Sequence, residues 1–157
     1  MKTGNPDVDR PVPLSLESTM KPYKTFDHTA DLGLTVTGQS VGELYANAAV
    51  AVFDIITDLG RVEPRETRRI TVEGDSPEDL LINFLREILY LYNGERWLLR
   101  EIRVTMIGDN GIEAEAVGEP LELQKHEICK EIKAVTYHQA RVRKASGGWE
   151  ARVIFDV

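Results

Sequence analysis

The sequence has almost no cysteine, since Cys129 is the only one among its 157 residues. No disulfide can form within the chain, which excludes a disulfide-stabilised secreted scaffold and fits a reducing compartment. Long apolar runs are also missing, because no stretch approaches the roughly 18 residues of a membrane span. The first 20 residues have no continuous apolar core of the signal-peptide kind. These absences predict a cytoplasmic protein with no membrane partner.

An excess of positive charge is absent as well. The formal net charge is -7, so the surface as a whole repels a phosphate backbone, which excludes sequence-independent nucleic-acid binding by the entire surface. The segment 125–144 differs, because it is locally basic. This segment fits an acidic partner, RNA or an ordinary solvated sheet face, and direct RNA binding stays open. Its basic residues are Lys125, Lys130, Lys133, Arg141, Arg143 and Lys144.

The length suits one domain preceded by a short extension. A chain of 157 residues can bury a core without disulfides or metal. Residues 1–20 are polar, contain three prolines and show no sustained hydrophobic period, which predicts a flexible N-terminal extension. We therefore expect a single domain over residues 21–157.

Two amphipathic helices are predicted from hydrophobic period and end signals. The first begins at a capping box of Ser40 and Glu43, and Gly60 is its expected end. The second begins at Ser76 and carries a wide apolar stripe typical of a helix lying deep against a sheet. Gly94 is its expected end.

The remaining periodic segments indicate strands. Apolar residues alternate over 32–36, and a short strand is expected over 68–73. Two hairpins are expected over 102–117 and 131–157, around the turns Asp109-Asn110-Gly111 and Ser146-Gly147-Gly148. Because helices do not alternate regularly with strands, we predict an α+β fold of two layers, in which two helices pack on a largely antiparallel sheet.

Three carboxylates at opposite ends of this domain are candidate metal ligands. Asp31 lies on the strand face opposite the apolar residues that follow it, and Asp156 alternates with the apolar residues of the last strand. The terminal carboxylate of Val157 is one residue further on. If the first and last strands are neighbours, these groups converge and suit a hard cation such as Ca²⁺ or Mg²⁺. The alternative is that both aspartates are merely solvated acids at strand ends.

Other candidates for chemistry have weaker support. His28 fits a ligand or acid–base group, but also a hydrogen-bonded structural histidine. Tyr137 and His138 fit positions beside the carboxylates or ordinary cross-strand packing. His126 and Cys129 have half of a zinc spacing, although no second pair completes it.

Four stretches together make the sequence resemble the archease family. Their order and the coverage from about residue 23 to the end match that family, and the first stretch alone would be a weak signal. The stretches are Phe26-Asp27-His28-Thr29-Ala30-Asp31, Asp79 to Leu89, Lys133-Ala134-Val135-Thr136-Tyr137-His138, and Val153-Ile154-Phe155-Asp156-Val157.

The resemblance implies a non-catalytic accessory factor of an RtcB-type RNA ligase in tRNA splicing. Such a factor promotes guanylylation of the ligase and its multiple turnover. The resemblance also implies that Asp31, Asp156 and Val157 hold a divalent metal, Ca²⁺ in the first place, with Mg²⁺ and Mn²⁺ as alternatives. Two other functions stay open: a chaperone-like module for enzymes such as a tRNA methyltransferase, with a structural metal, and a metal-dependent phosphoester hydrolase.

Overall fold

The computed structural model describes residues 21–28 and 30–157, so the extension predicted over residues 1–20 lies outside the described part. Seven strands, two α-helices and a short 3₁₀ helix make up the regular structure of the described chain. In order they are β1 (Tyr23–His28), β2 (Asp31–Gly38), α2 (Val41–Ile56), η1 (Leu59–Arg61), β3 (Glu66–Glu73), α3 (Pro77–Asn93), β4 (Trp97–Ile107), β5 (Gly111–Pro120), β6 (Ala134–Ala145) and β7 (Gly148–Asp156).

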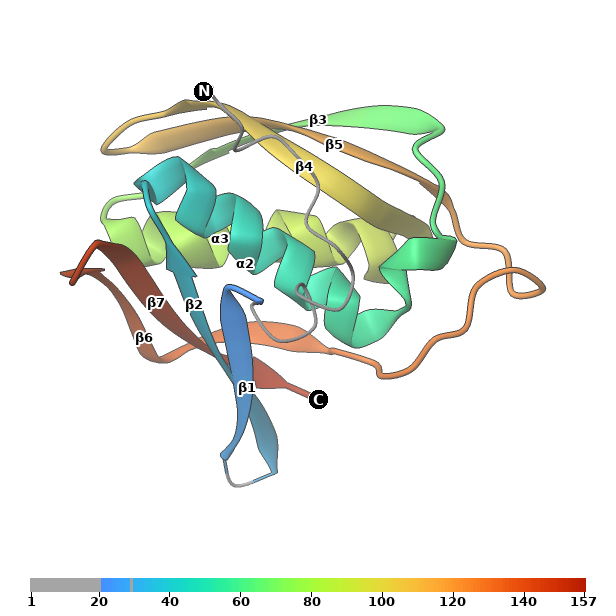
Figure 1. Cartoon of the computed structure of the whole chain (residues 1–157), viewed down its shortest axis with the longest axis horizontal. Coiled ribbons are helices and arrows are strands. Elements are labelled where there is room, and N and C mark those ends of the chain that lie inside the picture. Colours follow the sequence, from blue (N-terminus) through green and yellow to red (C-terminus); the bar gives the residue numbers. More distant parts are fainter. Residues whose placement is uncertain (1–20, 29) are drawn as a thin grey trace.

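The strands of the described chain belong to two sheets, and every pairing between them is antiparallel. The first sheet has four strands in the order β1-β2-β7-β6, and the second has three in the order β3-β5-β4. Figure 1 shows α2 and α3 lying between the two sheets. The last strand, β7, therefore lies next to the early strand β2, and its final residue lies beside the first residue of β2.

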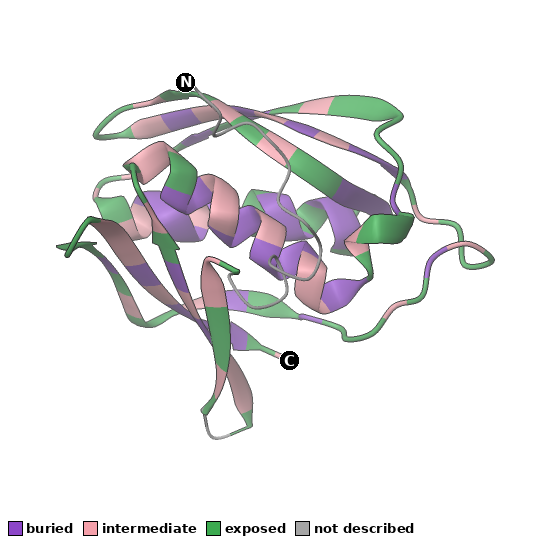
Figure 2. Ribbon diagram, viewed as in Figure 1, coloured by how far each residue is buried: buried purple, intermediate pink, exposed green. Residues whose placement is uncertain are grey.

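Helix α2 is buried on more than one side because it contacts both sheets. At about 100° per residue its buried positions cover more than half of the helix circumference, as expected for a helix with a sheet above and below it. Several of these positions are alanines, whose small side chains allow strands to approach closely. Figure 2 shows the buried colour concentrated on the helices and on the inner strands. The buried residues of α2 are Leu44, Tyr45, Ala48, Ala49, Ala51, Val52, Phe53 and Ile56.

Both predicted helix starts are confirmed. The Ser40 hydroxyl accepts a hydrogen bond from the Glu43 backbone N–H at 3.1 Å. The Glu43 carboxylate accepts from the Gln39 N–H at 2.7 Å, one residue before the expected partner. Ser76 caps α3 in the same way, accepting from the Asp79 N–H at 3.0 Å. Each cap satisfies a backbone donor that the helix itself leaves unpaired.

One predicted helix end is confirmed and the other is wrong. Helix α3 ends at Asn93 with Gly94 as its C-cap, as predicted. Helix α2 ends at Ile56, four residues before the glycine at position 60. The reason is a long-range contact, because Thr57 is extended, pairs with Ile128 and donates its hydroxyl hydrogen bond to the Glu127 carbonyl at 2.6 Å.

The α+β class is confirmed, with two helices packed against antiparallel β-structure. The sequence patterns did not reveal that the strands are divided between two sheets with the helices between them (Figure 1). This division has a consequence for function. The outer face of the four-stranded sheet is turned away from both helices, and it carries Asp31 and Asp156, two of the three predicted metal ligands.

Candidate metal centre on the outer face of the four-stranded sheet

Asp31 and Asp156 are direct cross-strand partners. Asp31 is the first residue of β2, Asp156 is the last residue of β7, and the antiparallel register places them opposite each other. Side chains directly opposite in such a pair have Cβ atoms about 4.5–5.5 Å apart and lie on the same face of the sheet. The two carboxylates, which we call the acid pair, are therefore close enough to converge on one cation.

The acid pair lies on the outer face of the sheet. The neighbouring register pair, Leu32 and Phe155, faces the core, so by the two-residue alternation of strands the next pair faces outward. Asp156 is exposed and Asp31 is partly buried. A partner molecule can thus reach these carboxylates without entering the core.

The backbone around Asp156 is held from two sides. Its carbonyl accepts a hydrogen bond from the Lys133 N–H at 2.7 Å, and its Cα is paired with Ala134 as well as with Asp31. Residues just before Lys133 are tied to α3, because the Asn93 side chain donates to the Ile132 carbonyl at 3.0 Å. The end of the last strand is therefore fixed by a helix and two strands.

The turn that leads into Asp31 contains a residue in an uncommon conformation. Ala30 has φ 71°, in the left-handed region that residues with a Cβ rarely adopt. Such local strain persists only where the surrounding structure imposes it, and it is concentrated at functional sites. The β1–β2 pairing imposes it here, since His28 is paired with Asp31 across the turn.

The donor set of the acid pair fits a hard divalent cation. Two carboxylates from the aspartates, with the Val157 carboxylate one residue away, offer only oxygen ligands, which Ca²⁺, Mg²⁺ and Mn²⁺ prefer. Within residues 21–28 and 30–157, no three or more His, Cys, Asp or Glu side chains form a cluster able to hold a metal. The predicted site is compatible with this, because it consists of two side chains and a main-chain carboxylate.

The residues predicted to lie beside the ligands have different positions. The backbone of His28 pairs with Asp31, while its side chain is not described. His138 is exposed, and its backbone N–H donates to the Thr136 hydroxyl at 3.3 Å. Tyr137 is turned toward helix α3, where its hydroxyl donates to an Asp79 carboxylate oxygen at 2.5 Å.

The Tyr137–Asp79 contact gives Tyr137 a structural partner. The hydrogen bond from Tyr137, with a second from the Asp75 N–H, lowers the pKa of Asp79. The same bond is the main cause of the raised pKa of Tyr137. The Arg86 guanidinium lies 4.9 Å from the centre of the Tyr137 ring, which adds a cation–π contact. The contact ties β6 to the first turn of α3.

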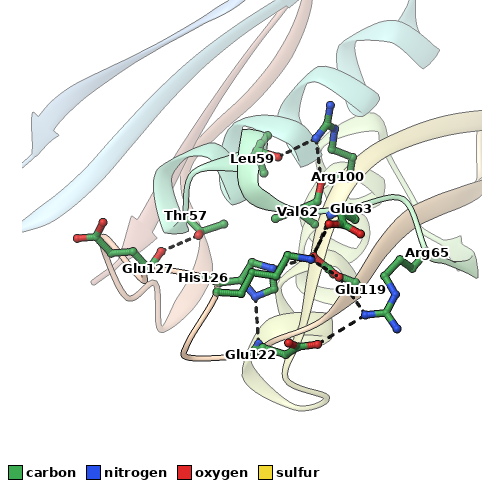
Figure 3. A network of polar contacts seen from close by, with 11 residues as sticks. Thr57, Leu59, Val62, Glu63, Arg65, Arg100, Glu119, Glu122, His126 and Glu127 are labelled. Carbon is green, nitrogen blue, oxygen red and sulfur yellow. Dashed lines mark hydrogen bonds and ion pairs between the residues drawn. The ribbon is translucent and has the colours of Figure 1, made fainter.

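Sequence reasoning missed a second cluster of charge, which is buried. Glu119, near the end of β5, has no exposed side-chain surface, yet it contacts three basic side chains. Lys125 approaches to 2.8 Å, His126 to 2.8 Å and Arg65 to 3.3 Å, and the Glu63 N–H donates at 2.9 Å. Figure 3 shows these side chains converging from the loop after β5 and the segment before β3. We call this group the Glu119 cluster.

The partners of Glu119 determine its charge state. Burial by itself would raise the pKa of the carboxyl group, but hydrogen bonds from Lys125, the Glu63 N–H, His126 and Arg65 outweigh burial and lower its pKa to about 2. Glu119 is therefore ionised at neutral pH. The ion pair with Glu119 correspondingly raises the pKa of Lys125.

The tautomer of His126 follows from its two hydrogen bonds. Its Nδ1 accepts from the Glu122 N–H at 3.0 Å, so the proton is on Nε2, which donates to Glu119 at 2.8 Å. Both ring nitrogens are thus engaged, while Cys129 is an exposed free thiol. These contacts give His126 a structural role and disfavour the half-zinc site considered from its spacing with Cys129.

The Glu119 cluster fastens the irregular segment 121–133 to the domain. On one side it holds the chain before β3, and nearby Arg100 donates to the carbonyls of Leu59 at 3.2 Å and Val62 at 2.8 Å (Figure 3). Further along the same segment, the Cys129 N–H donates to the Ile56 carbonyl at 2.7 Å and so ties the segment to the end of α2. Its role is structural, because every charged group has a partner inside the cluster.

No helix within the described residues is long and apolar enough to cross a bilayer.

Comparisons with known proteins identify the family. The model of the Archease protein family (MTH1598/TM1083) matches residues 23–157. Protein archease of Pyrococcus abyssi is 37% identical over 142 residues, which cover 88% of this chain and 100% of that protein. Protein archease of Methanosarcina barkeri is 36% identical over 146 residues, covering 90% and 100%.

Solved structures agree with this result. The solution structure of Methanobacterium thermoautotrophicum protein 1598 matches with a TM-score of 0.74 and 31% identity, covering 88% of this chain and 100% of that one. The crystal structure of a Thermotoga maritima archease, described as a possible chaperone, matches with a TM-score of 0.58 and 22% identity, covering 85% and 96%, and supports the fold alone. The chain therefore belongs to the archease family.

Proposed function

We propose that this protein is an accessory factor that activates an RtcB-type RNA ligase in tRNA splicing by means of a divalent metal held at the acid pair. The observation that carries the proposal is the register of β2 and β7, which sets Asp31 directly opposite Asp156 on an outward face. Membership of the archease family makes the ligase the first partner to test.

Asp31, Asp156 and the Val157 carboxylate would hold the metal. When bound, a divalent cation neutralises negative charge that develops at a phosphoryl-transfer centre. The chain's own contribution is to hold the carboxylates in place. The Lys133 N–H and the pairing with Ala134 fix Asp156, and the β1–β2 pairing fixes Asp31. Since the acid pair faces outward, it can be presented at the active site of another protein.

Substitution of the acid pair tests the proposal. We expect Asp31→Ala and Asp156→Ala to abolish stimulation of ligase guanylylation and of multiple turnover, while the ligase alone keeps its basal rate. Asp109→Ala is the matched control, because Asp109 is an exposed acid after β4 of the other sheet. Undiminished stimulation by folded Asp31→Ala and Asp156→Ala proteins would falsify the proposal.

A chaperone-like role for tRNA-modifying enzymes is the second candidate, favoured by the description of the Thermotoga maritima relative as a possible chaperone. On this alternative the metal serves stability only. The acid-pair variants would then lose stability, but at a temperature where they remain folded they would still bind and stimulate the partner. Measuring thermal unfolding and stimulation on the same samples separates the two roles.

The third candidate function is enzymatic, and it can be tested on the purified chain alone. A metal-dependent phosphoester hydrolase would turn over substrate without a partner protein. We expect the purified chain with Ca²⁺, Mg²⁺ or Mn²⁺ to leave a chromogenic phosphomonoester and a phosphodiester unchanged. Turnover that disappears in Asp156→Ala would favour the hydrolase over the accessory factor.

A further inference from the structure

The outer face of the four-stranded sheet has a second distinctive feature besides the acid pair. The registers of three strand pairings connect Lys24, Thr35, Arg152 and Arg141 in one straight row across β1, β2, β7 and β6. Adjacent strands are about 4.8 Å apart, so the row spans about 14 Å. We call it the cationic row.

The side chains of this row face outward. Leu34 comes just before Thr35, and Val153 comes just after Arg152. Both Leu34 and Val153 are fully buried in the core. By alternation Thr35 and Arg152 lie on the opposite face. Lys24 and Arg141 are exposed, and Thr35 and Arg152 are partly buried. The row therefore presents three positive charges and a hydroxyl group on the same surface as the acid pair.

The cationic row contains like charges side by side, and the nearby acid Glu150 is paired with Arg143 instead. Arg141 and Arg152 are direct cross-strand partners, and like charges in that position destabilise a sheet. Across residues 21–28 and 30–157, none of Lys24, Arg141 and Arg152 forms an ion pair with an acid. By contrast, Arg143 in the next row is bound to Glu150 at 2.7 Å. A bound anion would offset the repulsion between the Arg141 and Arg152 guanidinium groups.

Arg152 is held in position by two contacts. Its guanidinium lies 4.2 Å from the centre of the Phe26 ring, and one nitrogen donates to the Gln139 side-chain oxygen at 3.0 Å. Phe26 can lie across the sheet because its partner is Gly33, where a Cβ would come within 2.1 Å of the ring. A guanidinium held over a ring loses little freedom when its remaining N–H groups bind an anion.

A bulge in β6 contributes Gln139 to this arrangement. Between the pairs Thr136–Ile154 and Arg141–Arg152, β6 contains more residues than β7, and Gln139 takes φ 56° in the left-handed region. Bulges re-aim side chains and are common beside functional sites. Two hollows adjoin this bulge. One of about 150 Å³ is lined by Thr35, Arg141, Arg152, Ala151 and the ion pair of Arg143 with Glu150, and a shallower one is lined by Gln139, Ala140, Arg141 and Arg152.

We infer that the cationic row is a binding surface for the phosphate backbone of single-stranded RNA. Guanidinium groups bind phosphate oxygens in a bidentate manner, and three cations in line suit a polyanion with regularly spaced charges better than one small anion. The acid pair lies four residues away along β2, or about 13 Å, so RNA on the row would be held beside the predicted metal ligands. The inference does not depend on the ligase proposal, because the binding is to the isolated chain.

The chain's net charge explains why such binding would be local. At -7 the surface as a whole repels RNA, so only an unneutralised group of cations can hold it. Few phosphate contacts imply weak binding with a shallow salt dependence. For single strands, each contact adds about 0.7 to the slope of log affinity against log salt concentration.

The test is binding of a fluorescein-labelled uridine 12-mer, followed by anisotropy across a salt series without any ligase. We expect Arg141→Gln and Arg152→Gln each to weaken binding by about tenfold. Each should also reduce the salt slope by about 0.7, the value for one lost contact. Lys24→Gln should act in the same direction with a smaller effect, since a lysine makes a less directional contact.

Arg103→Gln is the matched control. Arg103 is an exposed arginine on the other sheet and is paired with Glu115 at 2.5 Å, so its loss changes the net charge equally. Its binding should equal that of the unmodified chain. Equal weakening by all of these variants, or no measurable RNA binding at low salt, would overturn the inference. So would displacement of the RNA by polyglutamate at lower charge concentration than by unlabelled RNA, which would assign the row to an acidic protein segment.

Discussion

The acid pair and the Glu119 cluster are two carboxylate sites with opposite surroundings. Glu119 is fully buried and is contacted by Lys125, His126 and Arg65. Asp31 and Asp156 lie on an outer face with their like charges directly opposite each other. A buried carboxylate needs partners from its own chain, because leaving it unpaired costs several kcal/mol. A carboxylate pair at the surface tolerates repulsion, because solvent screens it.

This difference separates structure from function. Every charged side chain of the Glu119 cluster already has a partner within the cluster, so a ligand would have to displace one of these side chains. The acid pair lies on an outer face, where oxygen donors from two strands can bind a divalent cation. Both sites are built on ordinary carboxylates, and their burial, their register and the basic partners of Glu119 distinguish them. Substitutions at the two sites should therefore affect different observables.

The largest effect is expected from Glu119→Gln. This change leaves Lys125 and Arg65 without their common counter-ion, and breaking a buried ion pair costs about 3–5 kcal/mol of unfolding free energy. Chemical unfolding at neutral pH measures it. The matched control is Glu115→Gln on the same strand, whose exposed pair with Arg103 is worth at most about 1 kcal/mol. Equal losses from the two variants would mean that the Glu119 cluster stabilises the fold no more than an exposed ion pair does.

A smaller loss of unfolding free energy is expected when the unmodified chain is brought to acidic pH. The pKa of Glu119 is lowered from its ordinary value of 4.5 to about 2 in the folded protein. Its stabilisation is therefore present above pH 4.5 and is lost as the pH falls toward 2. The loss attributable to this group is about 3 kcal/mol. Unfolding curves of the unmodified chain and of Glu119→Gln should converge between pH 4.5 and 2, and parallel curves over that interval would contradict the assignment.

Local sequence patterns predicted most of the helices and strands but not the contacts that join them. The capping residues Ser40 and Ser76 could be recognised because a cap acts within four residues. The end of α2 could not, since it depends on Thr57 meeting Ile128. The presence of two sheets was hidden for the same reason. A wide buried arc on each of the two helices is the local trace of this arrangement.

The two carboxylate sites differ in how far the sequence revealed them. Asp31 and Asp156 could be singled out because strand alternation separates them from the core and because the archease resemblance implies that both belong to one metal site. Their common register could only come from the structure. Glu119 gave no signal, since its partner Arg65 is 54 residues away and an acid beside Pro120 at a strand end looks like a solvated one.

The smallest effect, and the one that distinguishes the two sites most directly, is expected at the acid pair. Without metal, Asp156→Asn removes a like-charge contact with Asp31, so the unfolding free energy should stay constant or rise by roughly 0.2–1 kcal/mol. A Glu119→Gln change has the opposite sign. Thermal unfolding in chelator detects the difference.

Added Ca²⁺ should then make the unmodified chain more stable than Asp156→Asn, which reverses their order in chelator. A ligand at 100 times its dissociation constant stabilises the folded state by about 2.7 kcal/mol, so the unmodified chain should gain stability that Asp156→Asn does not. Glu119→Gln should gain as much as the unmodified chain, since its cluster is separate from the acid pair. If Ca²⁺ stabilised Asp156→Asn equally, the cation would be bound elsewhere. The outward carboxylates would then be solvated strand ends, as the simpler interpretation of the sequence holds.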